Sequence, residues 1–151
     1  MASGGKDSKS RRRTKAASSR RASRPRIVIA DDDPLVLDQI CNLLESRFEV
    51  VGRARNGLEL IEAVQKLSPA VAVTDITMPE MNGIEAARRI ALNHSGVKVV
   101  VLSVHDDAGI VDAVFEAGAL AYVSKFVAYL ELIPAIEQAL VGRKYRSAGP
   151  R

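Results

Sequence analysis

From residue 27 onward, short apolar runs alternate with longer amphipathic stretches, a pattern that predicts strands and helices in turn. Apolar runs of strand length, several of them rich in β-branched residues, occupy residues 27–30, 48–52, 71–74, 97–102 and 121–123. Each run is followed by apolar residues at helical spacing, and the predicted helices cover residues 35–44, 58–67, 84–92, 106–117 and 130–141. The body of the chain is therefore predicted to consist of five strand–helix repeats.

Turn and cap residues lie where these elements should begin and end. Pro34 suits the first turn of the first helix, the pair Asn82-Gly83 precedes the third, and Gly118 follows the fourth. Pro134 fits the last helix only in its first turn, since further inside a proline removes a backbone hydrogen bond. The positions of these turn and cap residues agree with the element boundaries that the apolar pattern predicts.

Repeated strand–helix units with continuously apolar strands favour a parallel sheet that is covered by helices on both faces. Connections between parallel strands are right-handed, so the helices divide between the two faces. We expect an α/β domain with a doubly wound five-stranded parallel sheet. In such sheets, ligands bind beyond the carboxyl ends of the strands.

Composition narrows the class of protein. The 151 residues fit a single domain, and Cys41 is the only cysteine, which excludes a disulfide scaffold and makes a zinc site built on cysteine pairs improbable. No apolar run approaches the ~20 residues that a membrane-spanning helix needs. We expect a soluble, cytoplasmic protein with no membrane partner.

Charge is unevenly distributed along the chain. Residues 1–26 carry ten basic side chains and one acidic one, whereas the remainder carries 12 basic and 17 acidic side chains. The first segment has no aromatic residue, leucine, isoleucine or valine, so we expect a disordered basic arm. The predicted organisation is this arm over 1–26, a folded domain over 27–142 and a short basic tail over 143–151.

The basic arm has several interpretations. It could bind the phosphates of a nucleic acid through counterion release, or it could be a solvated tail or an extension from an upstream start codon. Its arginine- and serine-rich, acid-poor composition also matches a transit peptide. Composition alone supplies no group that reads bases.

The predicted strand ends place polar residues together. The first strand leads to Asp31 and Asp32, the third to Asp75, the fourth to Ser103 and the fifth to Lys125. Parallel strands present their carboxyl ends at one edge, so three carboxylates, a hydroxyl and an ammonium group should converge there.

Crowded carboxylates suit a hard divalent cation such as Mg²⁺, with Mn²⁺ as an alternative. The cation and Lys125 would together favour a phosphoryl group, and Ser103 could donate a hydrogen bond to it. A carboxylate can also be the nucleophile. The chemistry that fits is metal-dependent phosphoryl transfer onto Asp75.

Four sequence segments carry a resemblance to a known family. They are I-A-D-D-D-P-L at 29–35, D-I-T-M-P-E-M-N-G at 75–83, V-V-V-L-S at 99–103 and E-A-G-A-L-A-Y-V-S-K at 116–125. In this order and spacing they resemble the response-regulator receiver domain of two-component signalling, which has a flavodoxin-like fold. The sequence over residues 25–145 resembles the subtype of receiver domain that usually precedes a LuxR-type helix-turn-helix. The sequence stops at Arg151, so we expect a receiver without that output domain.

The resemblance implies a role for each matching residue. Asp75 would be the phosphoacceptor, and Asp32, Asp75 and the backbone carbonyl of Thr77 would bind Mg²⁺ directly, with Asp31 acting through water. Ser103 and Lys125 would contact the phosphoryl group, and Tyr122 would be an aromatic switch. Thr77 and His105 occupy positions where the family varies the lifetime of the phosphorylated state.

The resemblance also implies partners. The phosphoryl donor would be a histidine kinase or a phosphotransfer protein. A downstream protein would bind the face formed by the fourth predicted helix, the fifth strand and the fifth helix, and the same face could form a homodimer. The function so predicted is a phosphorylation-dependent switch rather than an enzyme.

Two other functions remain open from sequence. A hydrolase with an aspartyl-phosphate intermediate would need a second aspartate two residues after Asp75, where Thr77 stands. A binding module could instead use residues 1–26 on nucleic acid without any phosphorylation.

Individual residues also have purely structural interpretations. The run Asp31–Asp33 could be a solvated loop or a helix cap, Ser103 could cap a turn, Lys125 could be an ordinary surface residue, and Tyr122 could be a plain core aromatic.

Overall fold

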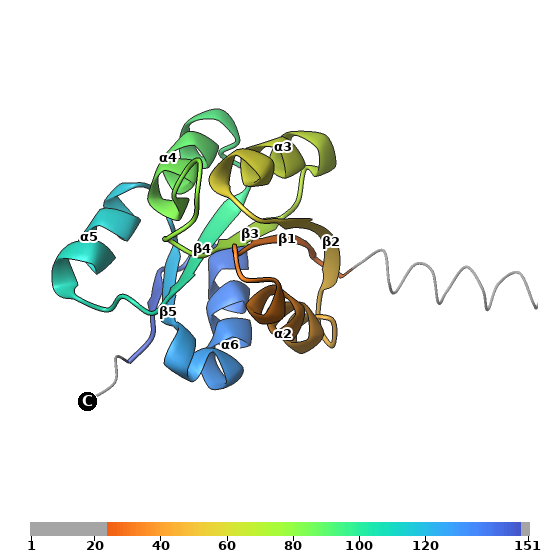
Figure 1. Ribbon diagram of the computed structural model, residues 1–151. Coiled ribbons are helices and arrows are strands. Elements are labelled where there is room, and N and C mark those ends of the chain that lie inside the picture. Colours follow the sequence, from red (N-terminus) through yellow and green to blue (C-terminus); the bar gives the residue numbers. More distant parts are fainter. Residues whose placement is uncertain (1–23, 149–151) are drawn as a thin grey trace, which may run out of the picture.

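The computed structural model describes residues 24–148, which fold into a three-layer α/β domain (Figure 1). The strands are β1 (Arg26–Ala30), β2 (Glu49–Ala54), β3 (Val71–Thr74), β4 (Lys98–Ser103), β5 (Ala121–Ser124) and β6 (Tyr145–Arg146). The helices are α2 (Pro34–Leu44), α3 (Gly57–Leu67), α4 (Gly83–Asn93), α5 (Ala108–Glu116) and α6 (Ala128–Leu140), with a 3₁₀ turn η1 (Lys125–Val127) before α6. The predicted basic arm lies largely outside the described residues.

The strands form one parallel sheet in the order β2-β1-β3-β4-β5-β6. The first strand, β1, lies inside the sheet. β2 pairs with one side of it, and β3, β4 and β5 follow in order on the other side. This reversal of strand order makes the sheet doubly wound, as predicted, and in such sheets the site lies beyond the carboxyl ends of the strands at the reversal, here β1 and β3.

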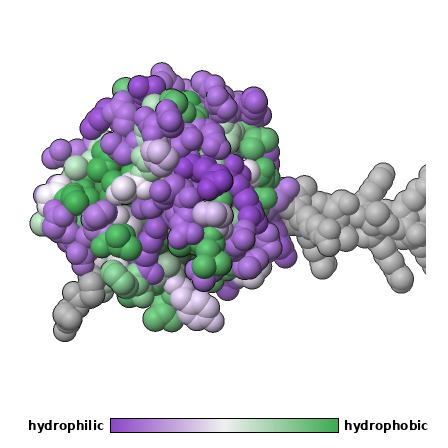
Figure 2. All heavy atoms as spheres, viewed as in Figure 1, coloured by the Kyte–Doolittle hydropathy of each residue, from purple (hydrophilic) through white to green (hydrophobic). Residues whose placement is uncertain are grey.

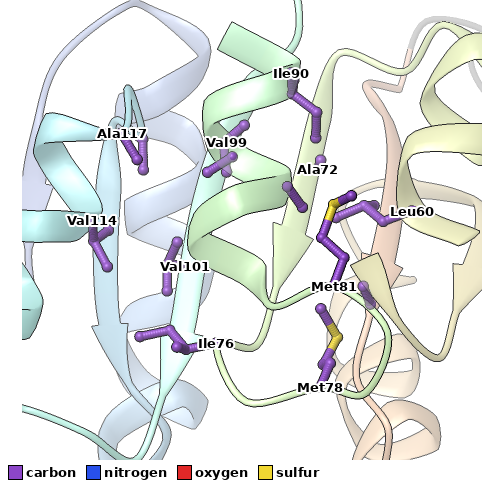
Figure 3. Packing of buried hydrophobic residues seen from close by; sticks show 14 of the residues in the cluster. Leu60, Ala72, Ile76, Met78, Met81, Ile90, Val99, Val101, Val114 and Ala117 are labelled. Carbon is purple, nitrogen blue, oxygen red and sulfur yellow. The ribbon is translucent and has the colours of Figure 1, made fainter. Parts of the chain in front are cut away.

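Each face of the sheet is covered by its own set of helices (Figure 1). One buried cluster joins the sheet to α3, α4 and α5, and Figure 3 shows part of it, with Leu60 near Ala72 on one side and Val114 near Val101 on the other. The other cluster joins the sheet to α2 and α6 through Ile29, Leu44 and Ile136. Burial on both faces explains why the inner strands are continuously apolar.

Short polar side chains fix where the helices begin. Four helices begin with a side chain that accepts a hydrogen bond from a backbone N–H in the first turn: Asp33, Asn56, Asn82 and Asp107. These caps satisfy amide groups that have no partner within the helix. The helix starts therefore follow directly from local sequence, and they position the loops that follow β1 and β3.

The C-terminal part of the domain differs from the prediction in two ways. The sheet has six strands rather than five, because Tyr145–Arg146 pair with Ala121 and Tyr122 of β5. The boundary predicted at residue 142 thus falls before the last strand. Helix α6 also begins at Ala128, so Pro134 is its seventh residue and lies inside the helix rather than in the first turn.

The face seen in Figure 2 is largely hydrophilic, with apolar side chains in separate small groups. Over residues 24–148, no helix combines the length and the apolar character that crossing a bilayer requires.

Candidate functional site

Asp31, Asp75 and Lys125 meet at the carboxyl edge of the sheet, as the strand ends predicted. The Lys125 ammonium nitrogen Nζ lies 2.8 Å from Asp31 Oδ2 and 3.0 Å from Asp75 Oδ2. The Asp31 side chain is 1% exposed, that of Asp75 10% and that of Lys125 18%. One cation therefore bridges two buried carboxylates that come from the ends of β1 and β3.

A third carboxylate completes an acidic group. Asp31, Asp32 and Asp75 each offer an oxygen atom, and these atoms all lie within 4.8 Å of one another. Asp32 is exposed, whereas the other two are buried, so the group opens to solvent on one side. Oxygen donors at this separation fit a hard divalent cation that keeps part of its water shell. The cluster could hold a metal ion.

Burial and charge act in opposite directions on the two central groups. Burial raises the pKa of Asp75, and this effect exceeds the lowering by the hydrogen bond and charge of Lys125. For Lys125, burial alone would lower the pKa, but the hydrogen bonds to Asp31 and Asp75 outweigh it and raise the pKa. Lys125 thus remains cationic, while the Asp75 carboxylate is held at an energetic cost.

The backbone around Asp75 is tightly fixed. Asp75 Oδ1 accepts a hydrogen bond of 2.7 Å from the Ile76 N–H, and the Thr74 hydroxyl donates to the Asp75 carbonyl at 2.9 Å. A side chain at Gly83 would place its Cβ 1.8 Å from that same carbonyl oxygen. The loop from Asp75 to Gly83 therefore folds back on the end of β3, and a residue without a side chain is required there.

Buried methionines hold this loop against the core. Met78 and Met81 are 8% and 7% exposed, and in Figure 3 their side chains extend toward the apolar cluster near Leu60. The Met81 carbonyl accepts a hydrogen bond from the Gly57 N–H at 2.9 Å. Packing of the loop therefore holds the Asp75 carboxylate in place beside Asp31 and Asp32.

Ser103 and Tyr122 are linked through His105. The buried Ser103 hydroxyl oxygen accepts a hydrogen bond of 3.1 Å from the His105 N–H, and the Tyr122 hydroxyl donates to the His105 carbonyl. Tyr122 is 2% exposed and belongs to the core. In this structure Ser103 caps the turn after β4, and the described hydrogen bonds do not join its hydroxyl to Asp75.

Two further predicted site residues, Thr77 and His105, contact each other, and Asp33 lies next to the acidic group in the chain. Thr77 is exposed, and its hydroxyl lies 3.3 Å from Nε2 of the exposed His105. Asp33 caps α2 by accepting from the Leu35 N–H at 2.9 Å, and its own N–H donates to Asp31 Oδ1 at 2.9 Å. Of the three consecutive aspartates, Asp33 therefore caps a helix, while Asp31 and Asp32 belong to the acidic group with Asp75.

This arrangement can be compared with known proteins. A family model of the response regulator receiver domain matches residues 27–137. The chain belongs to the response regulator receiver family. The receiver fold predicted from the motifs is thus confirmed, and the matched segment contains every predicted site residue of the acidic edge.

Two of the curated relatives carry the name transcriptional regulatory protein. The receiver domain is 39% identical over 121 residues to the transcriptional regulatory protein DegU of Brevibacillus brevis, covering 79% of this chain and 51% of that protein. It is 35% identical over 116 residues to PdtaR of Mycobacterium tuberculosis, covering 76% of this chain and 56% of that protein. The chain thus spans about half the length of the curated relatives it matches.

Solved structures show the same fold. A LuxR-family two-component response regulator from an Aurantimonas species has a TM-score of 0.78 and 34% identity, covering 82% of this chain and 89% of that one. The isolated receiver domain of RcsB from Salmonella enterica serovar Typhimurium, solved with the phosphomimetic BeF3-, has a TM-score of 0.76 and 28% identity, covering 83% and 94%.

Sequence reasoning missed two features of the receiver domain. The direct ion pair between Asp31 and Lys125 was not anticipated, although both were assigned to the same sheet edge. The buried Ser147 was assigned to the tail, but its hydroxyl accepts a hydrogen bond of 2.8 Å from the Ser124 N–H, next to Lys125. No apolar pattern indicated Ser147; the nearby Tyr145 was the only local signal.

Proposed function

We propose that this receiver domain is a phosphorylation-dependent switch of a two-component phosphorelay. Asp75 accepts the phosphoryl group from a histidine kinase or a phosphotransfer protein, and Mg²⁺ is the cation at the acidic group. The observation that carries the proposal is the position of Lys125 Nζ, 3.0 Å from Asp75 Oδ2, beside a cluster of three carboxylates that could hold a metal. A nucleophilic carboxylate, a fixed cation and a metal-binding group together are what transfer to an aspartate needs.

In the proposed transfer, a carboxylate oxygen of Asp75 attacks the phosphorus of a phosphohistidine. The new bond joins that oxygen to phosphorus, the phosphorus–nitrogen bond breaks, and its electron pair stays on the imidazole, which takes up a proton. The charge on the transferred group develops beside Lys125, whose Nζ already contacts Asp75 Oδ2.

Asp31, Asp32, Asp75 and the Thr77 carbonyl would hold the metal, with Asp31 acting through water. When bound, Mg²⁺ supplies positive charge that offsets repulsion between the carboxylates and the incoming phosphoryl oxygens. Burial raises the pKa of Asp75 and so disfavours its ionised form. A divalent cation beside it favours the ionised, nucleophilic form, which fits the expected dependence on such an ion.

Phosphorylation of Asp75 would then change the positions of Ser103 and Tyr122. A phosphoryl group on Asp75 offers oxygen acceptors to the Ser103 hydroxyl, which in this structure accepts from the His105 N–H. Tyr122 follows because its hydroxyl donates to His105. The face formed by α5, β5 and α6 changes as a result, and a downstream protein or a second copy binds it with altered affinity.

The exposed pair Thr77 and His105 would set how long the phosphoryl group survives, since Thr77 lies two residues after Asp75 and its hydroxyl is 3.3 Å from the His105 ring. Slow hydrolysis of the aspartyl phosphate would limit how long the signal lasts, and the domain would not act as an enzyme with rapid turnover. We place this switch in the cytoplasm, where its donor proteins operate.

The experiment is incubation of the full chain with Mg²⁺ and acetyl phosphate. Wild type should gain one acid-labile phosphoryl group by intact mass, whereas Asp75→Asn and a sample with chelator should not. Asp33→Asn serves as the matched control, because Asp33 caps α2 and should not affect labelling. Equal absence of label in wild type and Asp75→Asn would contradict the proposal.

A second function is compatible with the first. Residues 1–26 carry ten basic side chains against one acidic one, a composition that favours binding to nucleic-acid phosphates. The test is retention on DNA at rising salt: deletion of residues 1–23 should abolish it, and Asp75→Asn should leave it unchanged. Equal retention with and without the arm would exclude this role.

A further inference from the structure

The C-terminal segment Tyr145–Ser147 closes the edge of the sheet beside β5. Without it, β5 would present a row of unpaired backbone groups. The Tyr145 N–H donates to the Leu120 carbonyl and the Ser147 N–H to the Tyr122 carbonyl, both at 2.9 Å. In return, the Ser147 hydroxyl accepts from the Ser124 N–H at 2.8 Å. We call residues 145–147 the clasp.

Few contacts hold the clasp in place. Tyr145 is half-buried and its hydroxyl donates to Glu131 Oε1 of α6 at 2.6 Å, Arg146 is exposed, and Ser147 is 3% exposed. A strand of two residues, tied by a handful of hydrogen bonds, belongs to the part of a domain that opens most readily. Small changes at its partners on β5 can therefore shift its population.

Two series of contacts, each combining hydrogen bonds with covalent links along the chain, lead from the Asp75 site or the neighbouring Ser103 to the clasp. The first runs from Ser103 to His105, from His105 to the Tyr122 hydroxyl, and from the Tyr122 carbonyl to the Ser147 N–H. The second is shorter. Ser124 donates its N–H to Ser147 and directly precedes Lys125, whose Nζ contacts Asp75.

We propose that the clasp is a reversibly docked edge strand, and that occupation of the Asp75 site by a phosphoryl group releases it from β5. This inference rests on the proposed function. The described hydrogen bonds hold Ser103 and Lys125 in their present positions and hold Ser147 against β5. Movement of either residue toward a phosphoryl group on Asp75 disturbs a partner of Ser147, so the occupied site and the docked clasp disfavour each other.

The coupling is reciprocal by thermodynamic linkage. If occupation of the site weakens clasp docking by some factor, weakening the clasp must strengthen occupation by the same factor. Ser147→Ala removes the acceptor for the Ser124 N–H while keeping the backbone of the clasp. Arg146→Ala is the matched control, because Arg146 is exposed in the same two-residue strand.

The test uses the full chain with Mg²⁺ and beryllofluoride as the phosphoryl mimic. Fluorine NMR reports the adduct, with Asp75→Asn as the negative control, and hydrogen exchange reports the amides of Tyr145 and Ser147. We expect the adduct to speed exchange of both amides by about five- to tenfold. Ser147→Ala should lower the beryllofluoride concentration at half-saturation, and Arg146→Ala should leave it unchanged.

The possible failures are distinct. An adduct in wild type with unchanged or slower exchange at Tyr145 and Ser147 overturns the clasp and leaves the switch standing. Equal half-saturation in wild type and Ser147→Ala also overturns the clasp alone. Absence of an adduct in wild type overturns the proposed function, and the clasp coupling with it.

Discussion

The Lys125 ammonium and the Asp31 carboxylate form an ion pair of 2.8 Å although 94 positions separate them in the chain. The pair joins the end of β1 to the start of η1, with Asp75 on its other side. Because the Asp31 side chain is 1% exposed, loss of this partner would leave a buried carboxylate without its neighbouring cation. The ion pair therefore stabilises the fold as well as shaping the site.

Removing Lys125 should expose this dependence. Lys125→Ala leaves two neighbouring carboxylates buried without their cation, and we expect the free energy of unfolding to fall by about 2–4 kcal/mol. Urea denaturation in the presence of a chelator measures the loss. Lys66→Ala, on the exposed side of α3, should change stability by less than about 0.5 kcal/mol. Equal behaviour of the two variants would show that the pair contributes nothing.

Gly83 should tolerate no side chain. A Cβ there would lie 1.8 Å from the Asp75 carbonyl oxygen, which is backbone and cannot move independently of the site. We expect Gly83→Ala to lower the free energy of unfolding by about 2 kcal/mol or more and to impair labelling of Asp75. At Gly96 nothing lies within 4 Å of an added Cβ, so Gly96→Ala is the control and should be close to neutral. Similar unfolding curves for both would refute the close approach.

Asp75 should destabilise the domain near neutral pH. Burial raises its pKa in the folded state, so the folded protein holds this proton more tightly than the unfolded chain. That contribution is fully present below the unfolded pKa of about 3.9 and is lost as pH rises through the raised folded value.

Asp75→Asn lacks this dependence, so without metal it should melt about 2–5 °C higher than wild type near neutral pH. The difference should shrink as pH falls toward about 4. Thermal melts across this range with chelator present measure it. A variant that melts lower than wild type near neutral pH would show that the carboxylate stabilises the fold.

Tyr145 gives a second pH dependence, at the opposite end of the scale. Burial and the hydrogen bond to Glu131 raise the pKa of Tyr145 to about 12. Its contribution to docking of the clasp is complete below the ordinary tyrosine pKa of about 10 and is lost as pH rises through about 12. We expect carbon NMR to show Tyr145 titrating near 12 and Glu131→Gln to lower that value. A Tyr145 titration near 10 in wild type would contradict the contact.

Much of the site was predictable because it follows from chain topology. Asp31, Asp75 and Lys125 each come directly after an apolar strand, and parallel strands end at one edge. The start of α4 was visible for the same reason, since Asn82 acts on an amide only a few residues away. Information that is local, or that a fold rule makes local, can be recovered from sequence.

Other features depend on packing that no periodicity records. Two residues at 145–146 are too few to show a strand pattern, so β6 and the burial of Ser147 were missed. Pro134 was expected to fit the last helix only in its first turn, whereas α6 begins earlier and contains it in its interior. The ion pair of Asp31 with Lys125 depended on side-chain geometry that the strand ends alone do not set.

Mg²⁺ should stabilise the wild-type domain through the acidic group. Saturating Mg²⁺ binds the folded state, so the melting temperature should rise with its concentration. Asp32→Asn removes the exposed oxygen donor and should abolish most of this rise without lowering the metal-free melting temperature by more than a degree or so. A rise of equal size in Asp32→Asn would show that Mg²⁺ binds elsewhere.

Mapping the phosphoryl group tests the central claim most directly. After incubation with Mg²⁺ and acetyl phosphate, borohydride reduces an aspartyl phosphate to homoserine, which peptide mass spectrometry locates. We predict homoserine at position 75 of the wild-type chain. Homoserine at position 31 or 32 instead, or at no position in protein that binds Mg²⁺, would contradict the assignment of Asp75 as the phosphoacceptor.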